Sequence, residues 1–253
     1  MAIFDSDGLR LAYDDIGRPG EGRPMILVHG FASNRAENWR RLGWYGALER
    51  RGTRVIALDL RGHGESAKPH DLAAYGRDAM AGDIPNLMDH LGVARAHLLG
   101  FSLGARLALA AALRAPERFA TLTLGGIGEK LFEPRLAGNP MAEAMEAAEV
   151  ESIAEPMLKS FRQFADDQGE DRLALAALAR APDAPFAKEA LAKLAVPVLV
   201  VAGARDELAG DPQPLADIFP DGRAVRLPGV DHFSIIGHAL FKASVFDFLD
   251  GGL

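Results

Sequence analysis

A strand that passes directly into a helix around one serine constrains this chain more than any other sequence feature. Residues 96–101 form a short apolar run typical of a buried strand, and residues 103–109 are rich in helix-forming Ala, Leu and Arg. A Gly-x-Ser-x-Gly motif centred on Ser102 joins the two. So sharp a turn strains its central residue, and the glycines remove side chains that would collide. The pattern predicts a serine hydroxyl held above the sheet edge, beside the backbone N–H of Leu103 at a helix start that favours anionic oxygen.

The same motif also fits a glycine-rich turn in which Ser102 is only a helix N-cap. The rest of the chain decides between the two interpretations. With 253 residues, 49% of them hydrophobic, the chain can build one sizeable core or a core with a small accessory lobe.

Charge and composition argue against several classes of protein. The net charge is −7 and there is no basic tract, so we expect neither nucleic acid nor an anionic membrane surface as a partner. The chain has no cysteine, which excludes disulfides, a thiolate nucleophile and cysteine-based metal sites. The first residues lack the basic and apolar regions of a signal peptide, and no apolar run is long enough to span a bilayer. We therefore expect a cytoplasmic protein.

Strand and helix patterns alternate through most of the chain, which predicts an α/β fold with a mainly parallel, doubly wound sheet. The expected strands are a hairpin of 2–5 and 9–13, then 24–28, 54–58, 96–101, 119–124, 196–201 and 224–227. The expected helices are 38–51, 78–91, the segment between Ser102 and Pro116, 211–219, and a closing helix around Phe241, Val245 and Phe248.

The alternation stops between residues 128 and 194, where the pattern is only helical. We interpret 1–127 and 195–253 as the core and 128–194 as an inserted helical segment. Apolar residues at helical spacing predict three buried faces: Met141, Met145 and Ala148, then Met157, Phe161 and Phe164, then Leu173, Ala177 and Leu178. The phenylalanines and methionines suit a lid over an apolar substrate, although they fit ordinary core contacts of a small lobe equally well.

Four candidate residues follow strands, at the sheet edge where such folds bind ligands: Phe31, Ser102, Asp206 and His232. A serine hydroxyl is a weak nucleophile unless a base removes its proton, and histidine does this best near neutral pH. A buried carboxylate can fix the histidine tautomer and stabilise the imidazolium. The chain order Ser, Asp, His is the order that this sharp-turn architecture uses.

Along almost its whole length the chain resembles the α/β-hydrolase superfamily. The matching segments, in order, are His29-Gly30-Phe31, Asp59-x-Arg61-Gly62-His63-Gly64-x-Ser66, Gly100-Phe101-Ser102-Leu103-Gly104, Gly203-Ala204-Arg205-Asp206 and Gly229-Val230-Asp231-His232-Phe233. Each lies at the end of an expected strand or just after it.

The resemblance implies Ser102 as nucleophile, His232 as general base and then acid, and Asp206 as the residue that orients the histidine. It implies an oxyanion hole made by the backbone N–H groups of Phe31 and Leu103, a cap formed by the helical insertion, and no metal or organic cofactor. A serine at the motif's centre disfavours the family's haloalkane dehalogenases and epoxide hydrolases, which use aspartate there.

Several other residues compete for these roles. Asp231 and Glu129 are alternative acids, and Asp59 also follows a strand. We expect His29 and His63 to brace glycine turns, and Arg61 to brace a loop rather than bind an anionic substrate. The remaining histidines show no partner pattern and are expected to be structural or on the surface: His70, His90, His97 and His238.

The leading hypothesis is a serine hydrolase that cleaves carboxylic esters with small to medium apolar acyl chains through an acyl-enzyme. The same three residues would also serve a lactone, thioester or carbon–carbon bond hydrolase, and fold-level similarity does not choose among them. A non-catalytic small-molecule receptor with this fold is the alternative from another class. We expect a small-molecule ester as the partner, and a monomer or homodimer.

Overall fold

One eight-stranded sheet organises the computed structural model, which describes residues 2–17, 22–133 and 139–253. Its strands are β1 (Ala2–Ser6), β2 (Leu9–Ile16), β3 (Met25–Val28), β4 (Val55–Leu58), β5 (Ala96–Phe101), β6 (Phe119–Gly125), β7 (Val198–Gly203) and β8 (Gly222–Leu227). Their spatial order is β1-β2-β4-β3-β5-β6-β7-β8. Strand β2 pairs antiparallel with β1 and β4, and every pairing from β4 through to β8 is parallel. The predicted mostly parallel sheet is confirmed.

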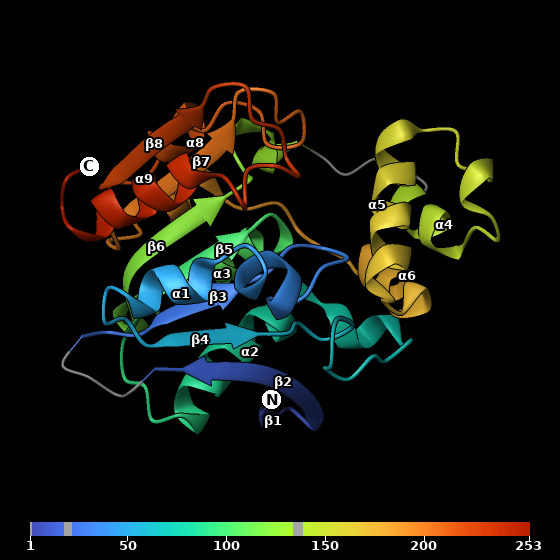
Figure 1. The fold of residues 1–253 in the computed structure, drawn as a ribbon, viewed down its shortest axis with the longest axis horizontal. Helices are drawn as coiled ribbons and strands as arrows, with labels where there is room; N and C mark the ends of the chain where they lie inside the picture. Colours follow the sequence, from blue (N-terminus) through green and yellow to red (C-terminus); the bar gives the residue numbers. More distant parts are fainter. Residues whose placement is uncertain (1, 18–21, 134–138) are drawn as a thin grey trace.

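Helices cover both faces of this sheet (Figure 1). They are α1 (Trp44–Glu49), α2 (Arg77–His90), α3 (Leu103–Arg114), α4 (Pro140–Glu146), α5 (Pro156–Gln168), α6 (Arg172–Arg180), α7 (Lys188–Leu191), α8 (Gln213–Ala216) and α9 (Ala239–Leu249). Ile26 and Val28 of β3 share a core with α2 and α3, while Met25 and Leu27 share another with α1 and α9. This alternation follows from the two-residue period of a strand and produces the doubly wound architecture.

At the turn from β5 to α3, backbone segments approach too closely for any side chain. Ser102 has φ of 52°, a left-handed value that non-glycine residues rarely adopt. A Cβ atom on Gly100 would lie 2.2 Å from the carbonyl oxygen of Gly104, and one on Gly104 would lie 2.2 Å from that of Val28 in β3. The two motif glycines are therefore required by packing.

Two buried histidines hold the loop that follows β3. Nε2 of His29 accepts the backbone N–H of Leu60, and Nε2 of His63 accepts that of Ala32, at 3.0 and 3.1 Å. Burial lowers the pKa of His29 to about 4 and that of His63 to about 3. Both rings are therefore neutral at pH 7 and can accept these bonds. The expectation that they brace glycine turns is confirmed.

Buried ion pairs support the loop that follows β4. The guanidinium of Arg61 binds the carboxylate of Asp83 through Nε and Nη2 at 2.9 and 2.6 Å, so its predicted role as a brace is confirmed. Asp59 accepts the backbone N–H groups of Arg35 and Glu65 and pairs with the Arg35 guanidinium. Through these bonds Asp59 connects the loop after β3 with the loop after β4.

The helical lobe, α4 to α6 (140–180), lies beyond the carboxyl ends of the parallel strands (Figure 1). It buries Met145, Phe161 and Leu175 in a small core that also takes in Ala32 of the loop after β3. The described residues between 128 and 194 contain helices and no strand, as expected, and 134–138 lie outside the described residues. Across all the residues that the structure describes, no helix is both long enough and apolar enough to cross a membrane.

Four details of the sequence prediction are wrong. Ala148, expected on the same buried face as Met145, lies beyond the end of α4 and is exposed. Residues 38–51 form a π-helical turn (Ala36–Arg40) and the short helix α1, separated by Gly43 with φ of 76°. The helix expected over 211–219 is only α8, because beyond it the backbone tightens to bonds of Ile218 with Leu215 and of Phe219 with Ala216, three residues apart. Leu173 is 54% exposed, since α6 buries Ala174–Leu178 instead.

Replacing Gly104 by alanine tests the close packing at the β5–α3 turn. We expect Gly104→Ala to lower the free energy of unfolding by about 3 kcal/mol or more, because its Cβ would overlap the Val28 carbonyl. Gly82→Ala is the matched control: Gly82 lies inside α2 with no atom within 4 Å of the new Cβ, so the variant should gain up to ~1 kcal/mol. Urea unfolding curves measure both, and equal effects would contradict the prediction.

A pH titration tests whether the two buried histidines, His29 and His63, are neutral in the folded protein. An unfolded histidine has a pKa of about 6.5. Because folding depresses the pKa of His29 and His63, their contribution to stability is fully present above pH 6.5 and is lost as the pH falls toward 4 and 3. We expect their imidazole NMR signals to show no titration between pH 8 and 5. The protein unfolded in urea is the control and should titrate near 6.5, whereas a midpoint near 6.5 in the folded protein would refute the assignment.

Candidate active site

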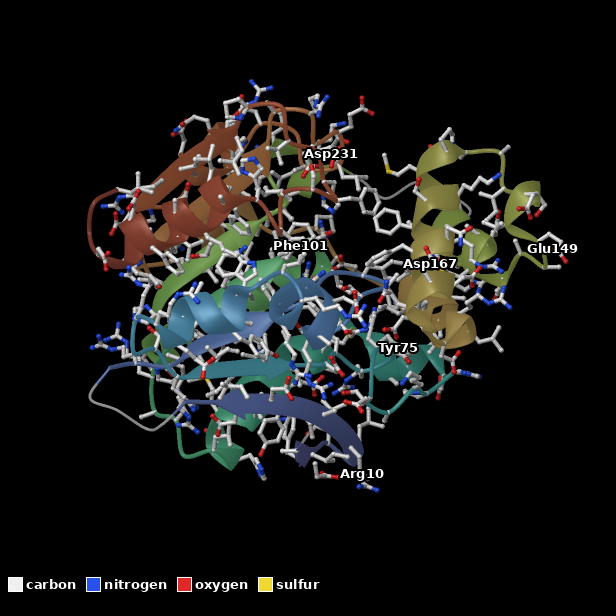
Figure 2. All side chains as sticks on the ribbon, in the orientation of Figure 1. Arg10, Tyr75, Phe101, Glu149, Asp167 and Asp231 are labelled. Carbon is white, nitrogen blue, oxygen red and sulfur yellow. The ribbon has the colours of Figure 1, made fainter. Side chains whose placement is uncertain are left out.

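Three of the residues singled out by the sequence meet at one edge of the sheet. Nε2 of His232 lies 3.0 Å from Oγ of Ser102, and Nδ1 of the same ring lies 2.8 and 3.0 Å from the two carboxylate oxygens of Asp206. Ser102 lies between β5 and α3, Asp206 follows β7, and His232 follows β8. Figure 2 shows Phe101 and Asp231, which precede the serine and the histidine, on the side of the core that faces the helical lobe.

Burial and neighbouring groups fix the orientation of these three hydrogen-bonded side chains. The Asp206 side chain is fully buried, and its Oδ1 also accepts the backbone N–H groups of Leu208 and Ala209. The His232 ring is 5.2 Å from the Phe101 ring, centre to centre. A carboxylate on Nδ1 requires the proton there, so Nε2 carries a lone pair directed at the serine hydroxyl. The arrangement can therefore accept the serine proton.

Two backbone N–H groups beside the serine find no acceptor among the described residues. In the described part of the chain, neither the N–H of Phe31 nor that of Leu103 donates a hydrogen bond, whereas the N–H of Gly30 donates to Oδ1 of Asn38 at 2.9 Å. Phe31 lines the cavity at Ser102, and Leu103 is the first residue of α3. Two free N–H groups, one of them at a helix start, form a site suited to anionic oxygen.

The alternative acids bond elsewhere. The Asp231 carboxylate accepts the hydroxyl and the backbone N–H of Ser234, and these bonds hold its pKa below the usual value. The Glu129 carboxylate accepts the backbone N–H of Asp211. Neither is hydrogen-bonded to His232 within the described residues.

The remaining histidines each contact a partner away from Ser102. His70 bonds Asp171, His90 bonds Tyr13, His97 bonds Thr121, and His238 accepts the N–H of Leu240 at the start of α9.

A cavity of about 260 Å³ opens at the serine. It is lined mostly by apolar side chains, with a few polar ones: Gly30, Phe31, Ser33, Glu37, Asn38, Leu42, Phe101, Ser102, Phe161, Phe164, His232, Phe233 and Ile236. Phe161 and Phe164 come from α5, so the helical lobe supplies part of the wall. Sequence reasoning missed Ser33, Glu37 and Asn38. The only signal for them was their place just after the His29-Gly30-Phe31 segment.

A buried carboxylate ties the helical lobe to the core. Glu170, between α5 and α6, accepts the side-chain amide of Asn34 at 3.0 Å and the backbone N–H of Gly64 at 2.8 Å. Burial raises the pKa of Glu170. Asn34 in turn accepts the N–H groups of Ala36 and Glu37, which begin the π-helical turn. The sequence offered no pattern for this contact, which joins residues 136 positions apart.

Comparison with known proteins agrees with this architecture. A curated relative from Pseudomonas putida, named as the dihydrolipoyllysine-residue acetyltransferase component of an acetoin cleaving system, is 39% identical over 166 residues. The match covers 63% of this chain and 43% of that protein, so it spans less than half of the relative's length.

Solved structures match over nearly the full chain. A hydrolase from Pseudomonas aeruginosa superimposes with a TM-score of 0.80 and 27% identity, covering 98% of this chain and 97% of the other. An enol-lactonase from Burkholderia xenovorans gives a TM-score of 0.81 and 25% identity, covering 98% and 100%. The family model of the α/β hydrolase fold matches residues 23–177, more than half of the sequence. The chain therefore belongs to the α/β-hydrolase fold family.

Proposed function

We propose that this protein is a serine hydrolase that cleaves carboxylic esters of small to medium apolar acyl groups. The observation that carries the proposal is the 3.0 Å hydrogen bond between Oγ of Ser102 and Nε2 of His232, inside a cavity walled by phenylalanines. The similarity to an enol-lactonase supports an ester-type bond, because a lactone is a cyclic ester. In this proposal the helical lobe acts as a cap that supplies the apolar wall for the acyl chain.

The first half of the reaction forms an acyl-enzyme. Oγ of Ser102 attacks the ester carbonyl carbon while Nε2 of His232 takes the hydroxyl proton. The carbonyl oxygen becomes an oxyanion that the N–H groups of Phe31 and Leu103 bind, and one such donor is typically worth about 3 kcal/mol. When the tetrahedral intermediate collapses, the bond to the alcohol oxygen breaks and His232 gives that oxygen its proton. Asp206 stabilises the imidazolium throughout.

The second half releases the acid. A water molecule replaces the alcohol, His232 takes one of its protons, and the resulting hydroxide attacks the acyl carbon. Collapse of the second tetrahedral intermediate breaks the bond to Oγ, which regains its proton from the histidine. The net result is one ester and one water converted into one acid and one alcohol.

Removal of the serine hydroxyl tests the proposed nucleophile. We expect a fluorophosphonate probe to label Ser102, and p-nitrophenyl esters from acetate to octanoate to be hydrolysed at rates that depend on chain length. Ser102→Ala should abolish labelling and lower kcat/KM by several orders of magnitude, since such residues act as a unit. Turnover within tenfold of the original would reject the nucleophile. Absence of both label and turnover in the original protein would favour a non-catalytic binding role.

Replacing the acid tests the orientation of the histidine. Asp206→Asn should lower kcat by about 10⁴, because the amide no longer favours the tautomer with its proton on Nδ1. Glu129→Gln is the control, since Glu129 also follows a strand but bonds the backbone of Asp211. It should keep kcat within a few-fold of the original. A severe loss in Glu129→Gln with a mild one in Asp206→Asn would reverse the assignment.

A further inference from the structure

One wall of the cavity at Ser102 is polar, in contrast to the phenylalanines that form half of the remaining lining. Ser33, Glu37 and Asn38 contribute this polar wall, and all three come from the loop and π-helical turn after β3. The proposed hydrolysis uses none of their side chains. The polar wall therefore needs a separate explanation.

The hydrogen-bonding capacity of the polar wall is partly unused. Ser33 is 2% exposed, and its hydroxyl has no hydrogen-bond partner among the described residues. Oδ1 of Asn38 accepts the N–H of Gly30, and within the described residues its NH2 group donates no hydrogen bond. A buried hydroxyl without a partner is unfavourable unless a ligand or water satisfies it. These groups are suited to a substrate oxygen.

The polar wall also carries one negative charge and no positive one. The Glu37 side chain is 16% exposed, and it pairs with Arg41, which is 69% exposed and outside the cavity lining. When the Gln168 amide is oriented with its NH2 group toward Glu37, its nitrogen lies 3.0 and 3.1 Å from the two carboxylate oxygens. Gln168 belongs to α5, so the Glu37 carboxylate lies where the lobe meets the core. Figure 2 places the preceding residue, Asp167, on this lobe. No lysine or arginine lines the cavity within the described residues.

We propose that the polar wall selects uncharged substrates bearing a second polar oxygen and rejects substrates bearing a carboxylate. The inference rests on the proposed ester hydrolysis and names its substrate class. Ser33 and Asn38 would donate to the second oxygen, while Glu37 would repel an anion held in a cavity of about 260 Å³. Arg41 lies at the surface, so solvent screens its positive charge more strongly than it screens the negative charge of Glu37.

Three p-nitrophenyl esters with six-carbon acyl chains separate charge from polarity: the hexanoate, the methyl adipate diester and the adipate monoester. We expect kcat/KM for the anionic monoester to be at least tenfold below that for the neutral diester. Glu37→Gln should shrink this ratio to about threefold or less, and Arg41→Gln should enlarge it. Glu49→Gln removes the same charge from an exposed position on α1 and should leave the ratio unchanged. Equal turnover of monoester and diester, or a ratio unaffected by Glu37→Gln, would overturn the proposal.

The hydrogen-bonding half of the proposal has its own variant. Ser33→Ala should lower kcat/KM for the neutral diester relative to the hexanoate by about fivefold, the usual effect of losing one neutral hydrogen bond. Since the hexanoate carries no second oxygen, the ratio of the two esters cancels any general effect of the substitution on folding or catalysis. An unchanged ratio would remove Ser33 from substrate recognition.

Binding without turnover separates failure of this proposal from failure of the proposed function. In Ser102→Ala, dimethyl adipate should raise the melting temperature more than monomethyl adipate does, and Glu37→Gln in that background should reduce the difference. If the esters are not hydrolysed but this difference is found, the hydrolase proposal fails and the polar wall stands. If the esters are hydrolysed but the two adipates stabilise equally, only the polar wall is refuted.

Discussion

The architecture depends on a contact between two pieces of backbone. Helix α3 starts so close to β3 that the Cα of Gly104 lies against the Val28 carbonyl, with no space for a methyl group. This contact, together with the equally tight approach of Gly100 to Gly104, forces the chain to reverse at Ser102 with a positive φ. The serine hydroxyl is consequently raised above the sheet, where His232 can reach it from the end of β8.

The loops around this turn are held by buried polar groups whose charges are compensated. Asp59 and Arg35 join the loops after β4 and β3, and His63 supplies an acceptor to the same region as a neutral ring. Such groups are unfavourable in a core unless each finds its partner, so the network specifies one arrangement of the loops. The network thereby holds the loop that contains Phe31, whose N–H meets no acceptor among the described residues.

Local patterns in the sequence were sufficient for the parallel sheet and for the residues that meet at Ser102, because each of these follows a strand and the ends of parallel strands converge. They failed where tertiary packing decides. The left-handed conformation of Gly43 divides one predicted helix, and α6 buries alanines rather than Leu173. The sequence also could not predict the polar wall or the role of Glu170, because the residues that they contact lie in loops and in the lobe and follow no periodic pattern.

Glu170 attaches the helical lobe to two loops of the core at once. Both of its carboxylate oxygens accept hydrogen bonds, one from Asn34 in the loop after β3 and the other from Gly64 in the loop after β4. Moving the lobe away from the core would break both hydrogen bonds and leave the carboxylate without partners unless water reached it. The lobe is therefore joined to the core by a polar contact as well as by the apolar packing around Ala32.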